Sequence, residues 1–205
     1  MPGSLSYTRR TLRVVRRSVA VAVSCCALLG IVRLVAPATA GAEGRPPRVE
    51  RQLTFLRQAL DDGAADEAQQ LFPEGHFFLH ALYGLSRAEA GMRLPEGQTR
   101  AASLREARWA LDQLESEAGR SPFSPSLVPS YGVFYRGWTN WLRGTVLALQ
   151  PADARDPAEV RRFDEGSAAL GAAFDASPTP FLASCPGQAW PVDSTVVRLR
   201  AAADR

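Results

Sequence analysis

The sequence has no lysine, and only two histidines and three cysteines occur among its 205 residues. It also contains no glycine-rich phosphate loop, no G-x-S-x-G motif and no CxxC pair. These absences argue against a P-loop nucleotide site, an α/β-hydrolase nucleophile and a cysteine-ligated zinc domain. Cys25 and Cys26 lie in an N-terminal apolar run, so Cys185 has no partner for an intramolecular disulfide once that run is removed. Cys185 is interpreted as a partly buried, inert thiol, with a lone nucleophile as the alternative.

The excess of basic charge is confined to the start of the chain. Residues 1–40 hold six arginines and no acid, which leaves 18 of the 24 basic side chains and all 21 acidic ones in the remainder. The remainder therefore carries a net charge of −3, and no stripe of basic and aromatic residues follows. We expect no nucleic-acid partner.

Residues 1–40 have the three-part pattern of an export signal. A basic segment precedes an apolar run from Ser18 to Val32, and Ala38-Thr39-Ala40 offers small residues for cleavage. Thr8-Arg9-Arg10-Thr11-Leu12 also resembles a twin-arginine signal. The alternative is a membrane anchor, which would be the only part of the chain in contact with a membrane. Both interpretations place the folded part outside the cytoplasm, beyond a linker at residues 41–46.

From Pro47 onward, apolar residues recur at helical spacing, and no segment has the period-2 alternation of a strand. The pattern predicts an all-α domain over residues 47–205. Amphipathic helices with a single apolar stripe alternate with helices that are apolar on most sides. The predicted helices cover residues 47–62, 64–71, 74–90, 99–118, 130–149 and 157–176, and a last one begins near Pro191.

A proline marks the loop that leads into each apolar helix. Pro73, Pro129 and Pro186 are separated by 56 and then 57 residues. This spacing predicts three helical hairpins, each with an amphipathic outer helix and an enclosed inner helix. Such hairpins stack into solenoids or close into double-layered toroids, and the apolar inner helices favour the toroid.

Two of these junctions resemble those of a known group of proteins. Phe72-Pro73-Glu74-Gly75-His76 and Ala189-Trp190-Pro191-Val192-Asp193-Ser194 look like the junctions between loops and inner helices in (α/α)6-toroid enzymes. The nearest relatives suggested are linalool dehydratase-isomerase-like proteins and the six-hairpin glycosidases and epimerases. The resemblance covers residues 47–205. A full toroid needs six hairpins and three are predicted here. The chain is therefore expected to be the N-terminal half of a longer protein, a truncated gene product, or an open half-ring that a partner chain completes.

In such toroids, the junctions surround a central cavity, so the resemblance points to a set of site residues. It implies proton transfer by Glu74 and Asp193, with His80 as a further catalytic group. Carbohydrates and isoprenoids are the substrates that such a cavity would hold. No cofactor and no metal are expected. The residues expected to bind substrate are His76, Tyr83, Tyr131, Tyr135, Trp138 and Trp190, and the second junction also supplies Arg136 and Asn140.

Each of these residue types has a structural alternative. Glu74 could stabilise a helix N-terminus through the macrodipole, and Asp193 could be an N-cap. His76 and His80 have the i, i+4 spacing of metal ligands, but no HExxH glutamate lies between them and no third ligand is evident, so a satisfied core or pocket is favoured. Trp138 could serve only in packing.

Two functions from different classes remain. The first is an exported or membrane-anchored toroid-like enzyme fragment of the lyase, isomerase or glycosidase type. The second is a non-catalytic helical-repeat module that binds a partner at the cell envelope. The second predicts an exposed apolar patch formed by Trp190, Val196, Val197 and Leu199.

Overall fold

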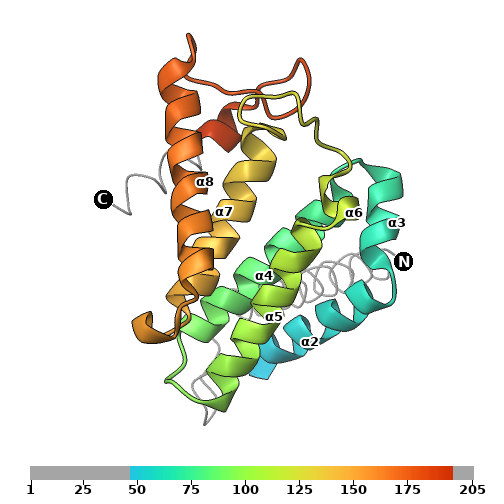
Figure 1. Cartoon of the computed structure of the whole chain (residues 1–205). Coiled ribbons are helices and arrows are strands. Elements are labelled where there is room, and N and C mark those ends of the chain that lie inside the picture. Colours follow the sequence, from blue (N-terminus) through green and yellow to red (C-terminus); the bar gives the residue numbers. More distant parts are fainter. Residues whose placement is uncertain (1–46, 196–205) are drawn as a thin grey trace, which may run out of the picture. The chain divides into compact units, whose positions relative to one another are not determined.

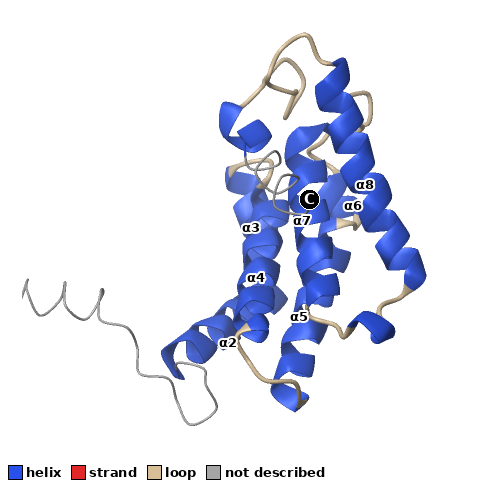
Figure 2. Cartoon of the chain, turned by 90° about the vertical axis from the view of Figure 1, so that its left-hand side faces the viewer, coloured by secondary structure: helices blue, strands red, loops and turns tan. Residues whose placement is uncertain are grey.

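The computed structural model describes residues 47–195. The predicted leader and linker, and the predicted patch residues Val196, Val197 and Leu199, lie outside the described residues. The chain divides into two units at Thr39 and Ala40, and every described residue belongs to the second. Residues 47–195 form helices and no β-strand, so the predicted all-α class is confirmed (Figures 1 and 2).

Seven α-helices and one 3-10 helix have complete bounds within these residues, and residues 191–195 begin a further helix. Along this stretch, no helix has both the length and the apolar content needed to cross a bilayer. The elements are α2 (Pro47–Asp61), α3 (Ala64–Leu71), α4 (Gly75–Met92), α5 (Gln98–Leu114), α6 (Glu117–Arg120), α7 (Gly132–Ala148), η1 (Ala152–Ala154) and α8 (Pro157–Ala176).

Local signals account for the ends of several helices. Asp156 caps α8 as predicted, because its carboxylate accepts a hydrogen bond from the backbone N–H of Ala158 at 2.8 Å. The prediction that one helix continues to Ala118 is wrong. It ends at Leu114, and Ser116 caps the short helix α6 by accepting from the N–H of Gly119.

Helix α4 is the centre of the packing. It contacts α2, α3, α5, α6 and α7, and Figure 1 shows α5 running along it. Phe77, Ala81 and Ala88 on α4 are fully buried in the main apolar core. Gly84 allows close approach of the neighbouring helices, because a Cβ there would lie 2.8 Å from both Ala110 Cβ and Leu142 Cδ2. The enclosed helix expected after Pro73 is therefore present.

Helix α7 joins this core to α8. Leu142 and Val146 are buried in the main core, whereas Val133 at the start of α7 packs in a second cluster with Leu170 and Ala173 of α8. The packing places the first turn of α7 close to the chain that follows α8. That proximity sets the geometry of the candidate site.

Candidate functional site

The chain after α8 returns across the first turn of α7. The backbone N–H of Val133 donates to Ala183 O at 3.0 Å. Gly132 has φ +83°, and a Cβ there would lie 2.5 Å from Ser184 O. Glycine is therefore required at this position both for its backbone conformation and for the close approach of the crossing segment.

A tight turn at residues 185–188 then redirects the crossing segment. The N–H of Gln188 donates to Cys185 O at 3.0 Å, and Gly187 takes the left-handed conformation with φ +73°. The chain next enters the helical residues 191–195, where the hydroxyl of Ser194 accepts from the N–H of Leu182 at 3.0 Å. These bonds fix the turn and the helix start to the crossing segment, which the bond from Val133 to Ala183 holds against α7.

A pocket of about 460 Å³ lies where this segment meets the starts of α4 and α7. Its lining contains residues that follow each of the three marker prolines, so these junctions share one hollow. Glu74 and Asp193 are both in the lining, as their predicted pairing requires. The lining residues are Phe72, Glu74, Phe78, Phe134, Ser184, Cys185, Gln188, Trp190, Val192 and Asp193.

Two separate hydrogen bonds form the polar side of the pocket. The hydroxyl of Ser184 donates to Asp193 Oδ2 at 2.6 Å, and the thiol of Cys185 donates to Glu74 Oε1 at 3.6 Å. Asp193 is only 7% exposed. Burial, the largest effect, raises the pKa of Asp193; the hydrogen bond from Ser184 lowers it, and the charge of Glu74 raises it. Asp193 consequently keeps its proton to a higher pH than an exposed aspartate does.

The thiol of Cys185 is poorly suited to nucleophilic attack. Burial and the neighbouring carboxylate of Glu74 raise its pKa, which favours the neutral thiol over the reactive thiolate. This agrees with the interpretation of Cys185 as a partly buried, inert thiol. Its observed role is to donate a hydrogen bond to Glu74.

The structural alternatives for the two acids can be examined directly. Glu74 occupies the N-cap position of α4 and its side chain makes no capping hydrogen bond, so its alternative role, stabilisation of the helix N-terminus through the macrodipole, stays a prediction. Asp193 is the third of the helical residues 191–195 and not their N-cap, so the capping alternative is wrong for it. The backbone N–H of Asp193 donates to Trp190 O at 3.1 Å, while its carboxylate faces Ser184.

His76 and His80 lie outside the lining of this pocket, on α4. Both are buried, their ring centroids are 4.4 Å apart, and Nδ1 of His80 lies 2.8 Å from His76 O. The ring of His80 also packs 5.2 Å from Trp109. Burial lowers the pKa of His80 to about 4 and lowers that of His76 as well. Across residues 47–195, histidines, cysteines and carboxylates nowhere gather in groups of three or more that could hold a metal ion.

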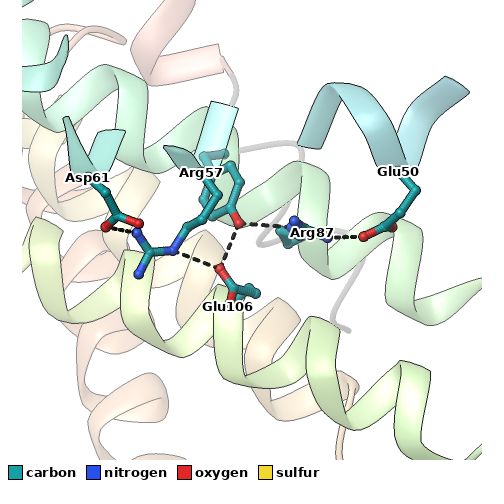
Figure 3. Close-up of polar contacts among 6 residues, drawn as sticks. Glu50, Arg57, Asp61, Arg87 and Glu106 are labelled. Carbon is teal, nitrogen blue, oxygen red and sulfur yellow. Dashed lines mark hydrogen bonds and ion pairs between the residues drawn. The ribbon is translucent and has the colours of Figure 1, made fainter. Parts of the chain in front are cut away.

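Tyr83 likewise lies outside the lining of this pocket. It belongs to a polar network that joins α2, α4 and α5, in which Figure 3 labels Arg57, Arg87 and Glu106. Its hydroxyl donates to Glu106 Oε2 at 2.7 Å and accepts from Arg87 Nε at 2.9 Å. Arg87 also bonds to Glu50, and Glu106 also accepts from Arg57 at 3.0 Å. Burial, followed by the hydrogen bond to Glu106, raises the pKa of Tyr83. Tyr83 is therefore engaged by two other side chains within the helix packing.

The predicted site residues of the second junction lie outside the lining of this pocket and in different surroundings. Tyr135, Arg136 and Asn140 line another hollow, of about 640 Å³, whose other wall is formed by α8. Tyr131 precedes α7 in the left-handed conformation, with φ +72°, and its ring packs 5.4 Å from that of Tyr135. Trp138 lies among aromatic rings, with centroids 5.8 Å from Phe78 and 5.2 Å from Trp141, as the packing alternative describes.

The lining residues that were not singled out from the sequence as site residues include Ser184, Phe134 and Phe78. Phe78 and Phe134 follow Pro73 and Pro129 by five residues each, so this shared spacing was a usable signal. Ser184 lies in an irregular segment, and its bond to Asp193 depends on a turn that carries no such signal.

Comparison with protein-family models, with curated proteins and with solved structures finds no match to this chain. The class that the geometry defines is accordingly an all-helical protein with an acidic and aromatic pocket, formed by the starts of two helices and a returning segment.

Proposed function

We propose that this protein binds a small molecule in the pocket formed by α4, α7 and residues 184–193, and transfers protons to and from it. The observation that carries the proposal is the presence of Glu74 and Asp193 in one lining. General acid–base catalysis requires two such groups to reach one substrate. The reaction class proposed is that of a lyase, an isomerase or a glycosidase.

The two acids have different surroundings, which suits them to different roles. Asp193 is buried and hydrogen-bonded to Ser184, and its raised pKa makes it the proton donor. Glu74 is only partly buried and accepts a hydrogen bond from Cys185, which leaves its second oxygen available as a base. Two carboxyl groups that differ in burial and in hydrogen-bond partner, as these do, are typical of acid–base pairs.

The opposite side of the pocket is apolar. Phe78 and Phe134 are nearly parallel, with centroids 6.3 Å apart and an interplanar angle of 18°. Trp190 is 54% exposed and Phe72 is 41% exposed, so their rings remain accessible to a ligand. These rings support the proposal of a sugar ring or an isoprenoid as the bound group.

The proposal also covers architecture and location. The enclosed helix α4 and the meeting of the three proline-marked junctions support an arrangement of helical hairpins like part of an (α/α) toroid. The signal-like pattern of residues 1–40 supports export, or anchoring, with the folded part outside the cytoplasm. A second chain would then complete the ring.

Substitution of the two acids tests the proposed reaction. Ligands would first be sought by the rise in melting temperature that carbohydrates and isoprenoid alcohols cause, and turnover would then be followed by NMR. Glu74→Gln and Asp193→Asn should each lower turnover by about 100-fold or more, the usual contribution of a general acid or base. Glu96→Gln, at an exposed turn between α4 and α5, is the control. Undiminished turnover in both pocket variants would exclude the acid–base pair.

One observation favours the alternative function, a non-catalytic module that binds a partner at the cell envelope. Trp190 is 54% exposed and Val192 is 62% exposed, so the segment around the pocket presents large apolar side chains to solvent. Analytical ultracentrifugation tests this alternative. A stable monomer that shows turnover would argue against it, and self-association lost in Trp190→Ser with Val192→Ser would support it.

A further inference from the structure

The pocket has an unusual balance of charge. Its lining contains two carboxylic acids and no arginine or histidine, and the sequence has no lysine. Four of the other lining residues are aromatic. These six residues are Glu74, Asp193, Phe72, Phe78, Phe134 and Trp190.

Several acids elsewhere in the described chain are paired with arginine. Glu50 pairs with Arg87 at 2.9 Å, and Arg143 pairs with both Glu115 and Glu159. Among residues 47–195, neither carboxylate of the pocket takes part in an ion pair, and the hydrogen-bond partners found for them are a neutral hydroxyl and a thiol. A charge on Glu74 has no counter-charge among the pocket residues, so a cation bound in the pocket would interact favourably with it.

Among residues 47–195, no arginine is found over the aromatic rings of the pocket. Elsewhere the chain places its own arginines over ring faces, with Arg57 3.6 Å from the Trp109 centroid and Arg136 5.7 Å from that of Tyr131. In the part of the chain that the structure describes, no arginine lies over Trp190, which is half exposed at the mouth of the pocket. Tryptophan is the best aromatic partner for a cation.

We infer that the ligand of this pocket is an organic cation, namely a molecule with a substituted ammonium group held between the carboxylate of Glu74 and the aromatic rings. Carboxylates attract its charge, while ring faces contact the alkyl groups that surround a substituted nitrogen. A volume of about 460 Å³ suits a small molecule. Ligands with a phosphate or carboxylate are disfavoured, because both would face like charge. This inference rests on the proposed function and narrows its substrate class, because the sugar or isoprenoid bound here would carry a substituted ammonium group.

Two probes of almost equal shape separate charge from fit. Choline and 3,3-dimethylbutan-1-ol differ in whether the quaternary atom is nitrogen or carbon, and isothermal titration calorimetry on the full chain compares them. The neutral alcohol should bind at least about tenfold more weakly, because it lacks the charge that the carboxylate of Glu74 and the aromatic rings recognise. Equal binding of the two would overturn the inference while leaving the acid–base pocket intact. Absence of choline binding would overturn it as well, and the turnover experiment would still decide the proposed function.

Variants of the pocket give a second measurement. Glu74→Gln keeps the side-chain shape and removes a charge, so it should weaken choline binding by about tenfold and leave the neutral alcohol unaffected. Trp190→Leu should weaken choline binding by at least about fivefold, because a ring face is lost. Glu96→Gln serves as the matched control, and circular dichroism confirms the helical content of each variant. If choline bound Glu74→Gln as tightly as it binds the wild-type protein, the cation would not be held by this carboxylate.

Discussion

The crossing of α4 with α5 and α7 at Gly84 gives a prediction whose sign depends on the packing. Gly84→Ala adds one methyl group to the middle of a helix. Gly171→Ala makes the identical change in α8, at an exposed position with no atom within 4 Å of the new Cβ. The two substitutions therefore share the gain in helix propensity and differ in what the methyl group meets.

The structure sets the size of that difference. Replacing an interior glycine by alanine stabilises a helix by about 1 kcal/mol, which should be the whole effect at Gly171. At Gly84 the new Cβ would lie 2.8 Å from Ala110 Cβ, which has no torsion with which to move away, and 2.8 Å from the fully buried Leu142. Overpacking of a core costs about 1–3 kcal/mol. We expect Gly84→Ala to destabilise the protein by up to about 2 kcal/mol, and to be about 1–3 kcal/mol less stable than Gly171→Ala.

Urea unfolding followed by far-UV circular dichroism measures both free energies of unfolding. Equal slopes of the unfolding transitions would show that the two variants unfold from comparably compact states. The reasoning would be refuted if Gly84→Ala stabilised the protein as much as Gly171→Ala does. Such a result would mean that α4 and its neighbours separate easily at this crossing.

Three further substitutions probe the core, a helix cap and a buried histidine. Phe77→Ala should lower the free energy of unfolding by about 3–5 kcal/mol, because Phe77 is fully buried, whereas Phe55→Ala, at a side chain 69% exposed, should change it by less than about 0.5 kcal/mol. Asp156→Ala should lower the same quantity by about 1 kcal/mol through loss of the α8 cap, and an unchanged value would show that the 2.8 Å hydrogen bond contributes nothing. Burial lowers the pKa of His80 from 6.5 to about 4, so between these two pH values the unfolded chain binds a proton that the folded chain does not. The contribution of His80 to stability is therefore fully present above pH 6.5 and is lost as the pH falls toward 4. The fall in melting temperature between pH 7 and pH 4.5 should be smaller in His80→Gln, and an equal fall would assign the pH dependence to other groups.

The parts of the fold that the sequence predicts well are those with local causes. Helix α3 has the predicted bounds because Gly63 and Pro73 lie just outside it, and α8 begins where Asp156 and Pro157 place an N-cap and a first helical residue. The end of α5 was misplaced because the apolar stripe continues past Leu114. The hydroxyl of Ser116 starts a new turn there, which periodicity does not reveal.

The candidate site was predictable only in outline. The recurring prolines predicted which segments would meet, and Glu74, Trp190 and Asp193 do line one pocket. The sequence could not show that Tyr83 and His80 lie outside the pocket, because their surroundings depend on which neighbouring helix covers each face of α4. The role of Ser184 depends on a crossing near Gly132 and a turn at Gly187, both of which require long-range packing.

The returning segment gives the pocket a mechanical property of its own. Residues 182–194 are fastened to the helical core by a small set of hydrogen bonds, which include Val133 to Ala183, while Asp193 is carried on the segment itself. A molecule bound between Glu74 and Asp193 would therefore link this segment to α4. When the molecule is present at 100 times its dissociation constant, it would raise the free energy needed to detach the segment from the core by about 2.7 kcal/mol. Proteolytic cleavage at residues 177–181, which precede the returning segment, would then become slower as more of the pocket is occupied. The cleavage rate would therefore report the fraction of pockets that hold a ligand.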